Sequence, residues 1–188
     1  TRKKAEVFTP SWIVNKMNNH CDEEWFGRPN VFNTETGTSW VTSSAPITFD
    51  RKLSWKGYVD SKRLEITCGE APYIVSRYDA ATGDIIPIKD RIGILDRKLR
   101  VVSENAADDA EWLKWAERAL QSSYGYEFQG DNLLIARGNV LHTFAEYYEE
   151  RFAARPDIKL LRKVTNIICW NFWQMDGLTG TIPFSIPK

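Results

Sequence analysis

The strongest constraint on the fold is an alternation of two hydrophobic patterns that starts at residue 63. Residues 63–67 and 124–128 have the short, apolar-rich composition of strands, and residues 166–172 form a nearly continuous apolar run typical of a strand covered on both faces. Segments of helical spacing lie between them, the longest at residues 131–152. Because strands joined by crossover helices run parallel, the pattern predicts an α/β fold with a mostly parallel sheet.

Four shorter helices are expected around this alternation. A proline followed by apolar residues at helical spacing predicts one helix over residues 11–20. Others are expected at residues 73–78, directly after a turn, and at 90–102 and 108–120, where apolar positions recur every three or four residues. Residues 22–62 are rich in aromatic and turn-forming residues, so we expect loops there with one or two short strands.

The chain is therefore divided into two parts. Residues 1–62 form an amino-terminal segment with one helix and aromatic-rich loops, and residues 63–188 form the α/β core, with a helical insertion at about 88–121. The 25 basic and 25 acidic residues leave no net charge. This neutrality argues against binding nucleic acid by bulk charge alone, because the phosphate backbone attracts clustered Lys and Arg.

The cysteines and the hydropathy pattern restrict the kinds of site and the location. Cys21, Cys68 and Cys169 are scattered and include no Cys-x-x-Cys pair, so we expect neither a disulfide framework nor a metal site. No apolar run approaches the ~20 residues of a membrane span, and no signal peptide is visible. These features predict a reduced, cytoplasmic protein that does not act at a membrane.

Three polar segments are predicted to meet at one edge of the sheet, because ligands of parallel sheets bind beyond the carboxyl ends of the strands. Gly69, in the turn at residues 68–72, lets the backbone approach a ligand. Glu127 can accept hydrogen bonds from ribose hydroxyls, and Asp176 can accept one from an adenine amino group. Each also has a structural interpretation, as a tight turn, a solvated strand end and a plain turn. Together they predict a site for an adenosine-containing ligand.

Four segments, in order, resemble the motifs of the N6-adenine DNA methyltransferases of restriction-modification systems. Residues 5–10 (AEVFTP) are similar to the amino-terminal motif that lies over the methyl donor S-adenosylmethionine. Residues 64–73 (LEITCGEAPY) resemble the first cofactor motif, with its acid, two residues, Cys-Gly and small-residue loop. Residues 124–127 (YGYE), followed by Asn139, resemble the second motif, and residues 176–178 (DGL) resemble the third.

The resemblance implies a Rossmann-like S-adenosylmethionine methyltransferase fold, and the sequence leaves open whether this chain completes it. It implies S-adenosylmethionine as the cofactor, with the amino-terminal motif at its methionine side and the 68–72 turn at its amino-acid moiety. Glu127 then holds the ribose and Asp176 the adenine. The residues that this assignment places at the cofactor are Phe8, Thr9, Pro10, Glu65, Thr67, Cys68, Gly69, Glu70, Glu127, Phe128, Asp176 and Gly177.

One motif of the family is missing from the sequence. Family members carry Asn or Asp, Pro, Pro and an aromatic residue, which hold and stack the flipped target base, but residues 1–188 contain no Asn-Pro-Pro-Tyr. We therefore expect the cofactor-binding portion of an adenine-specific DNA methyltransferase, without a catalytic residue and inactive alone. The full-length protein is expected to bind double-stranded DNA and a restriction or specificity subunit.

Two other functions are kept as alternatives. The first is a noncatalytic methyltransferase-like module that pairs with a partner subunit or DNA, which the missing motif favours. The second is a nicotinamide-dependent oxidoreductase. It ranks below the others because the sequence has no Gly-x-Gly-x-x-Gly fingerprint for a dinucleotide.

Overall fold

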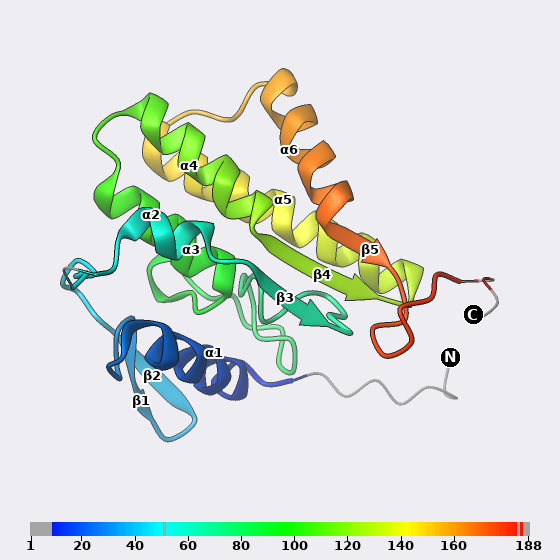
Figure 1. Ribbon diagram of the computed structural model, residues 1–188, viewed down its shortest axis with the longest axis horizontal. Helices are drawn as coiled ribbons and strands as arrows, with labels where there is room; N and C mark the ends of the chain where they lie inside the picture. Colours follow the sequence, from blue (N-terminus) through cyan, green and yellow to red (C-terminus); the bar gives the residue numbers. More distant parts are fainter. Residues whose placement is uncertain (1–8, 51, 184, 186–188) are drawn as a thin grey trace.

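The computed structural model describes residues 9–50, 52–183 and 185, and at its centre is a sheet of three parallel strands (Figure 1). The strands are β3 (Arg63–Ile66), β4 (Ser123–Glu127) and β5 (Phe172–Gln174), in the order β3-β4-β5. Leu64 of β3 lies opposite Tyr124 of β4. The predicted α/β class with a parallel sheet is confirmed, as are the strands expected at the first two positions.

Helices connect the strands in the order that parallel pairing requires. Between β3 and β4 the chain forms a short 3-10 helix, η1 (Ile88–Asp90), then α3 (Ile94–Asn105) and α4 (Asp109–Gln121). Between β4 and β5 it forms α5 (Gly130–Phe152) and α6 (Ile158–Asn171). Helices α3, α4 and α5 confirm the three longer helices predicted for residues 90 to 152.

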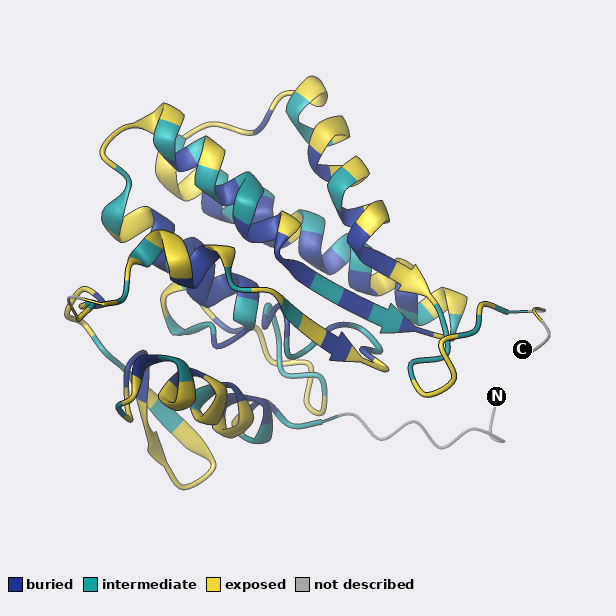
Figure 2. Cartoon of the chain, viewed as in Figure 1, coloured by how far each residue is buried: buried dark blue, intermediate teal, exposed yellow. Residues whose placement is uncertain are grey.

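Helix α5 supplies much of the hydrophobic core. It contacts β4 and β5 from one side of the sheet, and Figure 2 shows β4 and the helix surface facing it as mostly buried. The helical spacing read from the sequence predicts the apolar residues of its buried face, which are Leu133, Ala136, Val140, Phe144 and Tyr147. Burial of this face holds the sheet against the helices, because apolar surface removed from water stabilises the fold.

The strand predicted at residues 166–172 is wrong, because all but its last residue lie in α6. Asp157 begins this helix as its N-cap, and its carboxylate accepts a hydrogen bond from the Leu160 N–H at 2.7 Å. Only Phe172 belongs to the strand that follows, β5. The residues that α6 buries are spaced as in a helix: Val164, Ile168 and Asn171.

The helix predicted at residues 73–78 is also wrong, since this segment is a turn followed by irregular chain, and Tyr78 forms an isolated antiparallel bridge with Ile85. The carbonyl oxygens of Tyr73 and Ile74 accept hydrogen bonds from the N–H groups of Ile94 and Leu95, both at 2.8 Å. These N–H groups are among the unpaired donors that begin α3. The segment therefore caps α3 with carbonyls that a helix of its own would have used.

The amino-terminal part packs on the core through a helix and a hairpin. Helix α1 (Ser11–Phe26) is longer than predicted and ends at Gly27, whose φ of 67° is the left-handed conformation common at helix ends. The hairpin consists of β1 (Asn33–Thr36) and β2 (Ser39–Thr42), which confirms the short strands expected there. A further short helix, α2 (Trp55–Asp60), precedes the sheet.

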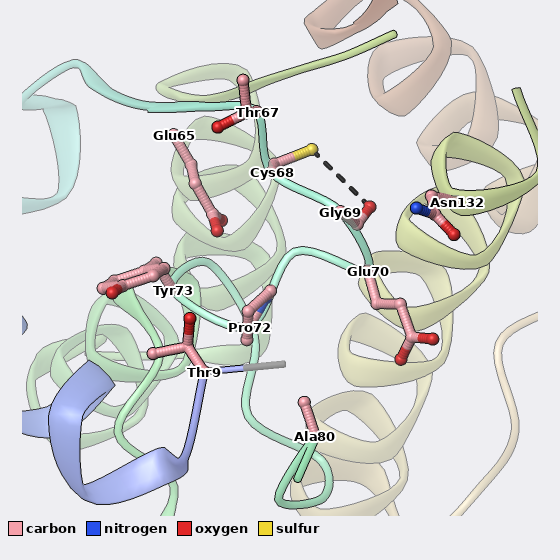
Figure 3. Close-up of a pocket in the computed structure, with 10 residues that line it drawn as sticks. All are labelled: Thr9, Glu65, Thr67, Cys68, Gly69, Glu70, Pro72, Tyr73, Ala80 and Asn132. Carbon is pink, nitrogen blue, oxygen red and sulfur yellow. Dashed lines mark hydrogen bonds between the residues drawn. The ribbon is translucent and has the colours of Figure 1, made fainter. Parts of the chain in front are cut away.

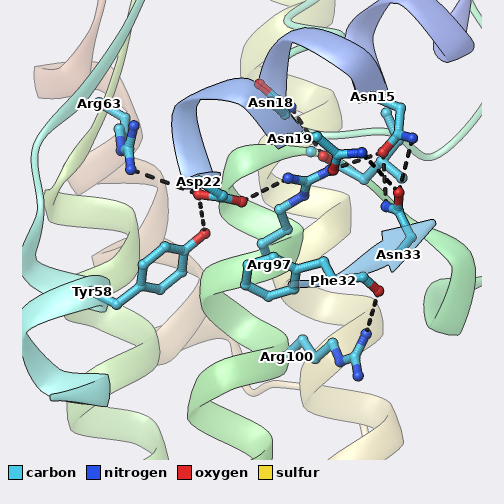
Figure 4. Close-up of polar contacts among 12 residues, drawn as sticks. Asn15, Asn18, Asn19, Asp22, Phe32, Asn33, Tyr58, Arg63, Arg97 and Arg100 are labelled. Carbon is cyan, nitrogen blue, oxygen red and sulfur yellow. Dashed lines mark hydrogen bonds and ion pairs between the residues drawn. The ribbon is translucent and has the colours of Figure 1, made fainter. Parts of the chain in front are cut away.

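A buried polar cluster fastens α1 to α3 (Figure 4). Arg97 of α3 is 1% exposed and pairs with Asp22 of α1 at 2.6 Å. The same guanidinium donates to Asn15 at 2.9 Å and to Asn19 at 2.8 Å, and it lies 5.1 Å from the centre of the Phe32 ring. Because buried charges are costly unless paired, this cluster fixes where α1 lies on the core.

Within the described residues, no helix combines the length and the apolar composition that crossing a membrane requires.

Candidate functional site

A pocket of about 180 Å³ opens at the carboxyl end of β3 (Figure 3). It is bounded by Glu65 of the strand, by the turn that follows it, by Thr9 just before the N-cap of α1, by one residue of the 79–85 loop and by one residue of α5. Figure 3 shows Glu65 and Tyr73 on one side of the turn and Glu70 and Asn132 on the other. The lining residues are Thr9, Glu65, Thr67, Cys68, Gly69, Glu70, Pro72, Tyr73, Ala80 and Asn132.

The turn at this pocket has an unusual backbone. Thr67, Gly69 and Ala71 all have positive φ, at 55°, 54° and 65°. Only glycine adopts this conformation without cost, and other residues there lose about 1–2 kcal/mol each. The Cys68 N–H donates to the carbonyl of Tyr126 at 2.8 Å, which ties the turn to the neighbouring strand. Strain of this kind is often found at functional sites.

Glu127 braces the same turn from the end of β4. Its side chain accepts one hydrogen bond from the Gly69 N–H and one from the Gln129 N–H, both at 2.7 Å. Glu127 is 7% exposed and lies behind the turn rather than among the lining residues. The predicted meeting of the first two segments is therefore present, and each carboxylate oxygen keeps a further lone pair for a ligand hydroxyl.

Glu65 lines the pocket and has one buried carboxylate oxygen without a hydrogen-bond partner in the described part of the chain. The residue is 9% exposed, and its Oε2 has no hydrogen-bond partner among the described residues. Burial raises the pKa of the Glu65 carboxyl well above its ordinary value, while the amides of Tyr73 and Ile74 lower this pKa and the charge of Glu127 raises it further. Buried polar atoms nearly always have a partner, so this oxygen is an exception within the fold.

Glu70 is held by two side chains from other parts of the fold. The Tyr78 hydroxyl donates to Glu70 Oε2 at 2.6 Å, and Asn139 Nδ2 donates to the Tyr78 oxygen at 2.9 Å and to the Glu70 carbonyl at 3.1 Å. Burial raises the pKa of Tyr78, and its hydrogen bond to Glu70 adds to the rise. Tyr78 therefore stays a donor, and the Glu70 carboxylate has a fixed position.

Cys68 is a packing residue at this site. It is 1% exposed, and its Sγ lies 3.9 Å from the Gly69 carbonyl oxygen (Figure 3). Burial raises the pKa of the thiol well above its ordinary value, and the charges of Glu65 and Glu127 raise it further. A thiol that keeps its proton is a poor nucleophile.

The third predicted segment, after β5, approaches the strand end without lining the pocket. The N–H groups of Leu178 and Thr179 donate to Asp176 Oδ1 at 2.9 and 3.2 Å and hold the pKa of Asp176 below its ordinary value. A side chain at Gly177 would overlap Ile66 of β3, so glycine allows this close approach. Asp176 therefore lies near the pocket, but its Oδ1 accepts hydrogen bonds from the turn that it begins.

The other predicted residues have varied positions. Thr9 lines the pocket, and Pro10 is the N-cap residue of α1, with its carbonyl accepting hydrogen bonds from the first turn. Phe128 is 48% exposed and lies outside the lining. Phe8 lies outside the described residues.

Some site residues were not predicted from the sequence. Ala80 and Asn132 join the lining, and Tyr78 supports Glu70 from behind. No local pattern marks these residues: Tyr78 and Ala80 reach the turn from the loop that follows it, and Asn132 reaches it from α5. Asn139 was part of the second motif, and its contact with the Glu70 carbonyl explains why an amide is useful at that position.

The described residues contain no group of three or more His, Cys, Asp or Glu side chains that could hold a metal ion. Comparison of the chain with protein-family models, with curated proteins and with solved structures finds no match in any of the three.

Proposed function

We propose that this chain is the S-adenosylmethionine-binding part of an adenine-specific DNA methyltransferase of a restriction-modification system. In this proposal the sheet belongs to a Rossmann-like methyltransferase fold, and Glu127 holds the ribose. Residues 1–188 contain no Asn-Pro-Pro-Tyr, so in this proposal they bind the cofactor and do not hold the target base. The chain by itself is then a binding part, inactive in methyl transfer.

The observation that carries the proposal is the composition of one pocket. Thr9, from the amino-terminal motif, lines the same cavity as Glu65 and residues 67–70 from the first cofactor motif. Glu127, from the second motif, bonds to the Gly69 amide at its edge. Segments more than 50 residues apart in the sequence thus meet where ligands of parallel sheets bind.

The charge of the pocket supports a cationic ligand. Its described lining includes the Glu70 carboxylate and neither Lys nor Arg, while burial favours the uncharged form of the second glutamate, Glu65. S-adenosylmethionine carries a sulfonium and an ammonium against one carboxylate, so its net charge is positive. A nicotinamide dinucleotide brings a pyrophosphate, which needs free backbone N–H groups or cations, and the Gly69 N–H is already bonded to Glu127.

Titration calorimetry with S-adenosylmethionine tests the proposal, with NAD as the competing ligand. We expect heat of binding with the first ligand and none with the second. Glu127→Ala removes the predicted ribose acceptor and lowers affinity at least about tenfold, the usual value of a hydrogen bond to a charged group. Glu24→Ala, at an exposed position of α1, is the matched control and leaves affinity unchanged. Binding of NAD alone would refute the proposal.

A second candidate, the noncatalytic interaction module, is favoured by an exposed apolar surface on the sheet. Leu64 and Ile66 of β3 are 44% and 50% exposed, and Trp173 of β5 is 41% exposed. Trp170 packs against Trp173 with ring centres 6.1 Å apart and is itself 66% exposed. Parallel sheets are usually covered on both faces, and large apolar patches mark interaction surfaces.

The two candidates give different results in one pair of measurements. The module predicts no heat with S-adenosylmethionine, together with binding of duplex DNA or of a partner protein that Trp173→Ser abolishes. Fluorescence anisotropy with a labelled duplex measures the DNA part. If the cofactor binds and Trp173→Ser leaves that affinity unchanged, the methyltransferase proposal is supported and the module alone is not sufficient.

A further inference from the structure

Helix α6 and β5, at one edge of the sheet (Figure 1), carry positive charge in a chain that has no net charge. Residues 158–175 contain Lys159, Arg162 and Lys163 and no Asp or Glu, and all three cations are exposed. Lys163 pairs with Glu117 of α4 at 2.7 Å, yet its side chain is 59% exposed. Lys159 and Arg162 form no ion pair within the described residues. This edge of the molecule therefore presents positive charge that no carboxylate neutralises.

The cations share one side of α6 with an amide and an aromatic residue. Residues about four apart lie above one another on an α-helix. Four exposed residues at this spacing form a line along the outer side of α6, with Arg162 beside it: Lys159, Lys163, Asn166 and Trp170. At a rise of 1.5 Å per residue the line is about 16 Å long. It offers charge at one end and an indole ring at the other.

A second indole ring lies beside the first. Trp170 is 66% exposed and Trp173 of β5 is 41% exposed, with ring centres 6.1 Å apart and ring planes at 59°. The Trp173 Nε1–H donates to the Trp170 carbonyl at 2.6 Å, which fixes the second ring at the end of the helix. Exposed aromatic rings of this kind are surfaces on which nucleobases stack.

A membrane surface is the other polyanion that basic, tryptophan-containing helices bind, but such a helix inserts an apolar face. The apolar side of α6 is already used, because Val164 and Ile168 are buried in the core. Its outer side instead carries polar residues among the cations, including Thr165, Asn166 and Cys169. The surface therefore favours a partner that brings both phosphates and flat rings.

We infer that the outer side of α6, together with Trp173, binds a single strand of nucleic acid. Lys159 and Arg162 contact the phosphates, and the two indole rings stack on unpaired bases. In a duplex the faces of the bases are stacked on each other, so the single strand binds more tightly. The inference goes beyond the proposed function and does not depend on the pocket, because none of these residues is among the described lining.

Fluorescence anisotropy with a labelled oligothymidylate of about 12 nucleotides tests the inference, with a duplex of the same length for comparison. Trp170→Ala is expected to weaken binding of the single strand about fivefold or more, because one stacked base is lost. Lys159→Gln combined with Arg162→Gln is expected to lower the slope of log affinity against log salt by about 1.4, or about 0.7 for each lost phosphate contact.

Two exposed residues of α1 provide matched controls, Trp12→Ala for the ring and Lys16→Gln for the charge. Each is expected to change affinity less than about twofold. Circular dichroism verifies that the variants are folded. Should Trp170→Ala not fold, the salt slope of the double cation variant decides the question.

Three results would overturn the inference. They are binding of the duplex as tight as that of the single strand, binding of phosphatidylserine vesicles without binding of the oligothymidylate, and an affinity and salt slope that the α6 variants leave unchanged. Absence of any binding to the oligothymidylate has the same meaning. None of these results affects the proposed function, because titration of Trp170→Ala with S-adenosylmethionine is expected to match that of the native chain.

Discussion

Loss of the Arg97 side chain is expected to destabilise the fold strongly. Arg97 is 1% exposed and makes hydrogen bonds to Asp22, Asn15 and Asn19. Removing one partner of a buried ion pair typically costs about 3–5 kcal/mol, because the other charge stays buried. In Arg97→Met the Asp22 carboxylate keeps the Tyr58 hydroxyl at 3.0 Å and the ion pair with Arg63 at 3.7 Å. We therefore expect the lower end, about 3 kcal/mol of unfolding free energy.

The assay is urea unfolding followed by tryptophan fluorescence, together with a thermal melt. A loss of about 3 kcal/mol corresponds to a fall in Tm of about 6–12 °C for a chain of this length. The matched control is Arg118→Met, which breaks an ion pair with Asp60 whose side chains are 41% and 50% exposed. An exposed pair of this kind contributes about 0–1 kcal/mol.

A double variant shows whether the cost comes from the unpaired charge. Asp22→Asn combined with Arg97→Met removes both charges, so the pair of changes is expected to cost about 2 kcal/mol less than the sum of the single changes. The reasoning is refuted if Arg97→Met costs no more than Arg118→Met. It is also refuted if the two single changes at the buried pair are additive.

Three further perturbations test the packing and electrostatics. Burial lowers the pKa of Lys98 to about 7, so above that pH the unfolded chain binds more protons. The unfolding free energy should then rise between pH 7 and 8.5, by up to about 1.4 kcal/mol per pH unit, and Lys98→Met should remove this rise in denaturant titrations at several pH values. In Gly125→Ala the new Cβ would lie 2.6 Å from the Phe172 ring, so we expect a loss of about 1–3 kcal/mol in urea unfolding. Gly138→Ala is the control: a Cβ at this position has no neighbouring atom within 4 Å, so the substitution should not destabilise the chain. Thr67→Gly relieves a φ of 55° and should raise the urea midpoint, by about 1 kcal/mol in stability; a lower midpoint would contradict the strain.

The elements that were predicted correctly are those whose own pattern decides their structure. The 131–152 segment has an uninterrupted helical spacing. Asp108 is the N-cap of α4, and its carboxylate accepts a hydrogen bond from the Glu111 N–H at 2.8 Å. Such signals act over three or four residues. They remain valid in any tertiary context that buries the apolar face.

The two elements predicted wrongly, at residues 166–172 and 73–78, have patterns that fit more than one structure, and tertiary contacts decide between them. A short apolar run fits a buried strand or one side of a helix equally well. In residues 166–172 the decisive signals were the Asp157 cap and the exposure of Trp170, 66% of its surface. Residues 73–78 have the apolar spacing of a helix, yet two of their carbonyls are used by the start of α3, which lies about 20 residues later.

The candidate site divides in the same way. The sequence by itself determined the parallel α/β arrangement and therefore the edge of the sheet where Gly69 and Glu127 meet, because helical crossovers impose parallel strands and align their carboxyl ends. Only the tertiary structure decided that Glu65 lines the pocket with one oxygen buried and unpartnered among the described residues, and that Tyr78 and Asn139 hold Glu70. Those contacts join positions as far as 69 residues apart, and no local periodicity encodes them, since they depend on how α5 and the turns pack against the sheet.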